Sequence, residues 1–256
     1  MIKNKIFPIL EWQCWSRLGW YDILSRYRRT ILGPFWIVLL TLVNIAAIGL
    51  VYGTLFKIHL GNFIPYMAIG LITWIWISSS LIEAASAFTS YKFVLINYKI
   101  HLTSIIIRVL VRNLIIFLHN CTVILLIVLF FGLSISPVMF IVLPAVFLTT
   151  GIIYVLSIPI AFICTRFRDL NQIIIVLINL GFLITPVIWF SDILLEHKYI
   201  VIYNPFAHIL DLVRLPILGS IPPTNSWLVS IVFFVFFAFL SFFCIRRYSR
   251  DVNFWL

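Results

Sequence analysis

The chain has 256 residues, of which 63% are hydrophobic and 10% are charged. Soluble domains have about 45–50% apolar and about 25% charged residues, and a mean hydropathy of +1.16 leaves too little polar surface to cover a water-soluble globule. The composition therefore excludes a soluble domain and predicts an all-α polytopic membrane protein. A net charge of +10 would favour nucleic acid as a partner of a soluble protein. In a membrane protein, enrichment of basic residues on the cytoplasmic side explains the charge without nucleic acid.

Residues 1–30 precede the first apolar stretch and are too polar to cross a membrane. When they are plotted at 100° per residue, most charged side chains fall on one face. The other face is apolar and holds Ile9, Trp12, Trp15, Trp20, Ile23 and Tyr27. This pattern predicts an amphipathic helix that lies in the cytoplasmic membrane interface, with a simple basic membrane anchor as the alternative. No cleavable signal is expected, because the segment has no continuous apolar core.

Six apolar stretches follow, at residues 34–56, 63–83, 109–133, 138–164, 172–190 and 226–245. Since a spanning helix needs about 20 residues, they predict six transmembrane helices. With the N-terminus inside, 15 of the 18 Lys and Arg residues fall in inner segments, and three (Lys57, Lys198 and Arg214) fall outside. The positive-inside rule therefore predicts that both termini are cytoplasmic.

The connection at residues 191–225 contains an amphipathic run at 206–218, bounded by prolines. Thirteen helical residues reach about 20 Å, which is too short to span a membrane. A short re-entrant helix between the fifth and sixth spans is expected, with a helix on the outer surface as the alternative. Asp211 and Arg214 are three residues apart and are predicted to pair, which lowers the cost of partial insertion.

Several kinds of chemistry are missing from the sequence. There is no P-loop, no HExxH or GxSxG motif and no paired-carboxylate pattern, and the four widely spaced cysteines predict neither a disulfide nor a metal site. Glu83 is the one acidic residue inside a predicted span, which argues against an ion-driven carrier and a membrane glycosyltransferase.

Arg108 and Arg112 are expected at the inner headgroups, where snorkelling to lipid is the alternative to a functional role. His119 and Asn120 lie about two turns deeper and are expected to make interhelical hydrogen bonds, with substrate contact as the alternative.

Five motifs in order along the chain are similar to those of one family. They are RYRRTILGPFW at 26–36, RVLVRNLIIFLHN at 108–120, RFRDL at 166–170 followed by LITPVIW at 183–189, NPF at 204–206 with LVRLP at 212–216, and RRYSR at 246–250 before the terminal Trp255 and Leu256. Together they resemble the membrane subunits of ABC-2-type polysaccharide exporters, particularly the O-antigen group. The resemblance covers nearly the whole chain.

The resemblance implies a homodimer with two copies of a separate nucleotide-binding subunit. That subunit would bind ATP and Mg, so this chain would hold no cofactor and would not itself be an enzyme. The expected substrate is undecaprenyl-pyrophosphate-linked O-antigen, moved across the bacterial inner membrane. The alternatives are an ABC-2 exporter of teichoic acid or capsule and, in a different class, a membrane-embedded glycosyltransferase.

The resemblance also implies roles for individual segments. Residues 84–107 would couple to the ATPase, with a docking helix at 91–101, although the proline that relatives often carry there is missing. Residues 191–225 would form an outer gate. The coupling residues would be Tyr91, Lys92, Asn97, Lys99 and His101, and the gate residues Phe206, His208, Asp211 and Arg214.

Guanidinium groups suit bidentate phosphate binding, so the substrate pyrophosphate is expected at Arg26, Arg28, Arg29, Arg108 or Arg112, with attraction to anionic lipids as the alternative.

Overall fold

The computed structural model describes residues 12–26, 28, 30–33, 35–55, 59–97, 100–133, 136–191 and 199–256. The side chains of residues 12–16, 26, 55 and 253 are outside this description. Within the described ranges every regular element is a helix, as the composition predicts.

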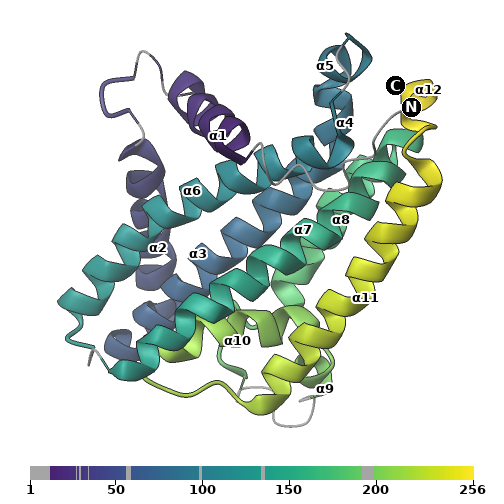
Figure 1. The fold of residues 1–256 in the computed structure, drawn as a ribbon. Helices are drawn as coiled ribbons and strands as arrows, with labels where there is room; N and C mark the ends of the chain where they lie inside the picture. The colour runs from purple at the N-terminus through teal and green to yellow at the C-terminus, as the bar shows by residue number, and fades with distance from the viewer. Residues whose placement is uncertain are drawn as a thin grey trace.

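Five helical stretches are long and apolar enough to cross a membrane (Figure 1). They are α2 (Phe35–Leu55), α3 (Leu60–Ala85), α6 (Leu102–Phe130), α7 (Val142–Arg166) with the short 3₁₀ helix η2 (Pro137–Ile141) before it, and α11 (Thr224–Tyr248). A sixth apolar helix, α8 (Leu170–Ile184), has 15 residues. The remaining helices are α1 (Trp12–Arg26), α4 (Ala87–Ser90), α5 (Lys92–Asn97), α9 (Tyr199–Ile202), α10 (Pro205–Ile217) and α12 (Val252–Trp255).

Two predicted boundaries are wrong. Helix α6 begins at Leu102, seven residues before the predicted span, because no proline interrupts the chain there and the apolar run at 105–107 continues the helix. Helix α8 ends at Ile184 instead of near 190. Thr185 takes an extended conformation (φ −85°, ψ 136°), as a residue before proline favours, so Pro186 ends the helix.

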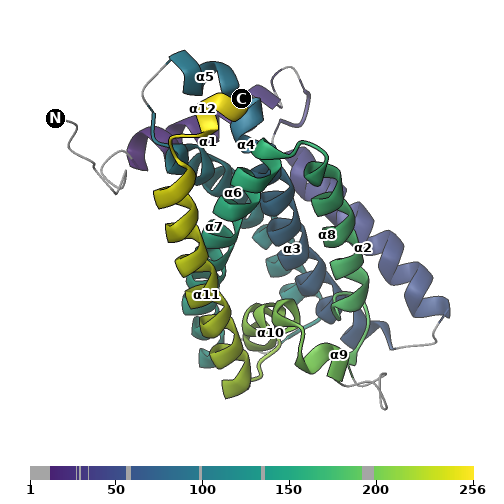
Figure 2. The same ribbon diagram turned by 90° about the vertical axis from the view of Figure 1, so that its right-hand side faces the viewer.

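The short helices gather at the two ends of the bundle. Figures 1 and 2 show α1, α4, α5 and α12 at one end and α9 and α10 at the other, with the long helices and α8 running between them. Most basic residues in the described ranges belong to helix ends or connections on the α1 side. Among the described basic residues, Arg214 lies at the opposite end, in α10. The α1 end is called the inner end below, and the α10 end the outer end.

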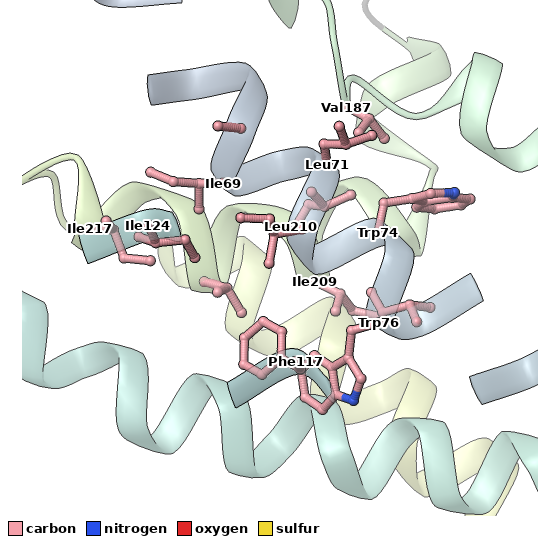
Figure 3. Close-up of a cluster of buried hydrophobic side chains, with 14 of the residues drawn as sticks. Ile69, Leu71, Trp74, Trp76, Phe117, Ile124, Val187, Ile209, Leu210 and Ile217 are labelled. Atoms are coloured by element: carbon pink, nitrogen blue, oxygen red, sulfur yellow. The ribbon is translucent and has the colours of Figure 1, made fainter. Parts of the chain in front are cut away.

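The main core lies where α10 meets α3, α6 and α7 (Figure 3). Leu210, Leu212 and Val213 of α10 are fully buried in it. Trp76 of α3 stacks on Phe117 of α6, with ring centroids 4.3 Å apart and planes 23° apart. Helix α10 is thus part of the main core.

Gly70 in the middle of α3 allows this packing. A Cβ at this position would lie 2.7 Å from the backbone oxygen of Val187 and 3.4 Å from a guanidinium nitrogen of Arg214. Because a backbone oxygen cannot rotate away, the chain after Pro186 can approach α3 only where α3 has no side chain.

We expect Gly70→Ala to lower the stability of the purified protein by about 1–3 kcal/mol, the usual cost of overpacking a core. Thermal unfolding in detergent, followed by tryptophan fluorescence, measures the change. Gly49→Ala is the matched control, because its Cβ would meet the movable side chain of Ile64 at 3.2 Å. Equal melting temperatures for the two variants would contradict the close approach at Gly70.

Candidate functional site

At the inner end, two arginines one turn apart on α6 contact carboxylates from two other helices. Arg108 donates from Nε and Nη2 to the two carboxylate oxygens of Asp22 in α1, at 2.8 and 2.5 Å. Arg112 donates from Nη2 to Oε2 of Glu83 in α3 at 2.5 Å, and its Nη1 lies 3.6 Å from Asp22 Oδ2. These four residues, the inner ionic cluster, join three helices with balanced charge.

Two polar residues extend the cluster toward the core. Asn113 donates from Nδ2 to Glu83 Oε2 at 2.5 Å and to the backbone oxygen of Val109 at 3.0 Å. Its Oδ1 accepts from the Ser79 hydroxyl at 3.0 Å. Glu83, the carboxylate predicted inside a span, therefore has a cation and an amide as partners, which offset the cost of removing its charge from water.

Helix α1 packs directly on α6. Gly19 makes this possible, since a Cβ there would lie 3.3 Å from the backbone nitrogen of Arg112. Ile23 is buried beside it, whereas Trp20 is 39% exposed. Asp22 and Ile23, which are adjacent in α1, both contribute to its contact with α6.

The two polar residues deeper in α6 differ in their surroundings. His119 is half-buried, and its ring stacks on Trp20 of α1 with a centroid distance of 6.1 Å. Its Nδ1 lies 2.8 Å from the backbone oxygen of Ile115 in its own helix. Asn120 is buried, and its Oδ1 has no hydrogen-bond partner among the residues that the structure describes. Among the described residues, His119 thus contacts α1 by ring stacking, and its hydrogen bond to Ile115 lies within α6 and not between helices as predicted.

Of the five arginines predicted to bind phosphate, the structure describes the side chains of Arg28, Arg108 and Arg112. Arg28 is exposed, and Arg29 and the side chain of Arg26 lie outside the described residues. Arg108 and Arg112 do come together, but each already binds a carboxylate. A pyrophosphate would have to compete with Asp22 and Glu83 for these two guanidinium groups.

The predicted coupling segment at 84–107 contains α4 and α5, between the end of α3 and the first turns of α6. Tyr91 connects the two, and its ring lies 4.7 Å from the guanidinium carbon of Arg108, a distance suited to a cation–π contact. Lys92, Asn97 and His101 are exposed, and His101 immediately precedes α6. Lys99 lies outside the described residues. Tyr91 therefore links the coupling segment to the inner ionic cluster.

Asp22→Asn should separate α1 from α6, because a neutral amide cannot compensate two guanidinium groups. We expect a loss of stability on the order of 2 kcal/mol, below the range for fully buried pairs because both partners are partly exposed. Spin labels on the exposed residues Tyr21 and Leu118 should report a broader α1–α6 distance distribution. Asp169→Asn, which removes an exposed carboxylate near the same end, should leave the distribution unchanged. An unchanged distribution in the Asp22 variant would show that apolar packing alone holds α1.

At the outer end, Asn204 fixes the start of α10. Its Oδ1 accepts from the backbone nitrogen of Phe206 at 3.0 Å, and its Nδ2 donates to the Thr185 hydroxyl at 2.9 Å. Pro205 occupies the first turn, where its missing N–H costs nothing. The same side chain thus begins α10 and ties it to the end of α8.

Arg214 is the buried cation of this end, with 2% of its surface exposed. It donates from Nη2 to Asp211 Oδ1 at 2.6 Å, which confirms the predicted pair, and from Nη1 to the backbone oxygen of Pro186 at 2.7 Å. Its guanidinium carbon lies 3.8 Å from the centre of the Tyr66 ring. Arg214 therefore connects α10, α3 and the segment after α8.

The other two predicted gate residues also join elements. The His208 ring lies between the Ser226 hydroxyl of α11 (3.0 Å) and the backbone oxygen of Ile202 (2.9 Å). Phe206 meets Trp74 of α3 edge to face, with a centroid distance of 5.8 Å. The rings of Trp74 and Phe206 line a cavity of about 180 Å³ between α3, α7, α8 and α10. The other residues that line this cavity are apolar except for Ser78.

Arg214→Met should destabilise the protein more than the double variant Asp211→Leu with Arg214→Met. The single change leaves a carboxylate without its cation, whereas the double change removes both charges. We expect a difference of about 2 kcal/mol, less than for a fully buried carboxylate because Asp211 is 25% exposed. Melting temperatures in detergent test this expectation. If the double variant melts as low as the single one, the contact with the Pro186 carbonyl matters more than the charge pair.

The structure is that of a polytopic helical membrane protein. Its inner end has a polar cluster beside the short helices α4 and α5, and its outer end contains the short buried helix α10. A profile of the ABC-2 type transporter family matches residues 13–218. The chain therefore belongs to this family of transporter membrane subunits.

Two relatives make the similarity more specific. The chain is 28% identical over 174 residues to the O-antigen export system permease protein RfbA of Myxococcus xanthus, in an alignment that covers 66% of this chain and 65% of that protein. It is 24% identical over 190 residues to the protein of the same name from Klebsiella pneumoniae, covering 73% of each. The chain is thus similar to ABC-2 permeases of O-antigen export, as its motifs indicate, and its match to the first relative spans about two thirds of that protein.

Proposed function

We propose that this chain is the membrane subunit of an ATP-driven exporter that moves undecaprenyl-pyrophosphate-linked O-antigen across the bacterial inner membrane. The observation that carries the proposal is the family match over residues 13–218, together with two relatives that are named O-antigen export permeases. The sequence has no P-loop, so ATP and Mg would be bound by a separate ATP-binding subunit, as the family implies.

The proposed topology has six crossings with cytoplasmic termini. Helix α8 would complete the sixth crossing together with the non-helical chain at 185–190 that connects it to the outer end. The concentration of basic residues at the inner end supports a cytoplasmic position for α1 and α12, with α1 in the membrane interface. A homodimer is proposed because six helices are few for a polymer-wide pore.

The contacts support a route by which ATP-driven movement would spread. A shift of α4 and α5 would act through Tyr91 on Arg108, which binds Asp22 of α1. Arg112 on the next turn would carry the shift to Glu83 at the end of α3. Helix α3 continues from there to Gly70 and Tyr66, which pack against Arg214. Helix α10 would then act as the outer gate, moved by its contacts with α3.

The lipid-linked pyrophosphate is proposed to bind at the inner end. Arg28 is exposed there, in the connection between α1 and α2, and Arg26 and Arg29 are its neighbours in sequence. Guanidinium groups at headgroup depth suit a diphosphate. Arg108 and Arg112 would contribute only if substrate displaced a carboxylate of the inner ionic cluster.

Neither alternative is favoured by these findings. Export of teichoic acid or capsule would use the same architecture, but the relatives reported above are named for O-antigen. A glycosyltransferase would need free carboxylates for a metal-bound sugar nucleotide, whereas Asp22 and Glu83 are held by arginines.

Reconstitution tests the proposal. The tagged chain is purified with its ATP-binding subunit, identified by a P-loop sequence, and both are placed in vesicles with undecaprenyl-pyrophosphate-linked glycan. We expect the glycan to become accessible on the opposite face only when ATP is present. Arg28→Ala should lower transport several-fold at limiting substrate, whereas Arg17→Ala, which removes an exposed arginine of α1, should not.

Three results would contradict the proposal. Movement of the glycan without ATP would exclude an ATP-driven exporter. Synthesis of product from a sugar nucleotide by the chain alone would indicate the enzyme. Equal substrate dependence of the Arg28 and Arg17 variants would remove Arg28 from substrate binding.

A further inference from the structure

The tail helix α12 folds back onto the coupling segment. Its Val252 is fully buried in a second apolar core with Phe88 of α4, Leu95 of α5 and Phe162 of α7. This inner core is separate from the main core around α10. Helix α12 is therefore held by the same side chains that position α4 and α5.

Polar contacts fix the end of the tail. Lys92 of α5 donates from Nζ to the backbone oxygen of Leu256. The guanidinium carbon of Arg166, at the end of α7, lies 5.5 Å from the centre of the Trp255 ring. Figures 1 and 2 both show α5 and α12 side by side at the inner end. The two short helices thus form one surface, although some 155 residues separate them in the sequence.

This surface exposes large apolar side chains. Phe93 and Ile96 of α5 are 72% and 54% exposed, and Phe254 of α12 is 88% exposed. In Figure 1, α5 is the described element that extends furthest from α10, beyond α1 and the ends of the long helices. If α1 marks the membrane interface, α5 lies on the aqueous side of it, where uncovered apolar side chains are characteristic of a protein interface.

The charge around the surface indicates what kind of partner covers it. The exposed basic side chains of α5, of the end of α7 and the connection after it, and of the end of α11 and the connection before α12 outnumber the acidic residues of these segments, Asp169 and Asp251. These basic residues are Lys92, Arg166, Arg168, Arg246, Arg247 and Arg250. A partner with an apolar groove and an acidic rim is complementary to them.

We propose that α5 and α12 together form a composite docking surface for the ATP-binding subunit, with Phe93, Ile96 and Phe254 as its apolar anchors. The inference rests on the proposed function, since it names where that subunit binds. It goes further in assigning part of the interface to the tail, because α12 lies beyond residues 13–218, which the family profile matches. Lys92 then has two roles: it belongs to the coupling segment and it holds the tail in place.

The test measures affinity with the purified ATP-binding subunit as the probe and the full chain in lipid nanodiscs. Phe254→Ala should weaken binding about 10-fold or more, the usual effect of removing an aromatic anchor. Phe140→Ala is the matched control, because it removes a ring that is 74% exposed at the outer end, and it should leave the affinity unchanged. Lys92→Met should weaken binding less, by releasing the tail without removing an anchor.

The results separate this inference from the proposed function. If the unmodified chain binds the subunit and Phe254→Ala binds equally well, the composite surface is wrong and the exporter proposal stands. If the unmodified chain does not bind the subunit at all, both fail.

A second measurement addresses the lipid as an alternative occupant. Phe254→Cys in nanodiscs should react with a water-soluble maleimide and become protected when the subunit is added. Protection by the bilayer alone would overturn the inference in favour of a membrane contact.

Discussion

The pairing of charges within the low-dielectric end of a helix bundle is the constraint on which the rest of this structure depends. Arg108 and Arg112 lie in the second and third turns of α6, where an unpaired guanidinium would be costly. Asp22 and Glu83 balance them, and each brings a different helix to α6. The positions of α1 and of the end of α3 are therefore consequences of where α6 places its arginines.

At the outer end, the buried cation is likewise paired, and one of its two acceptors is a backbone oxygen. Pro186 ends α8 early, and the backbone oxygen of Pro186 itself needs a donor inside the protein. Arg214 supplies it and uses its other nitrogen for Asp211. Gly70 gives the room that this arrangement needs. A buried arginine thus replaces the water that a loop would normally use, which explains how an irregular segment is tolerated inside the protein.

The two ends are joined by α3, which contributes Glu83 to one cluster and Gly70 and Tyr66 to the other. Helices pass on displacement well because their own hydrogen bonds keep them rigid. The inner core of α4, α5, α7 and α12 adds a compact platform at the end where an ATP-binding subunit would act. The two charge clusters therefore lie on one rigid helix, with the platform beside the first.

By itself, the sequence determined the helical class, five spans, the existence of α10 and the Asp211–Arg214 pair, because hydropathy, helix length and i,i+3 spacing are local properties. Its motifs also indicated the family. It did not show that Asp22 pairs with Arg108, 86 residues away, since periodicity assigns a residue to a helix face and not to a partner. Nor did it show that α12 and α5 share an apolar core. Only the tertiary structure decided these, because the partner of a charge or an apolar face depends on which helices meet, and that is set by the packing of the whole bundle.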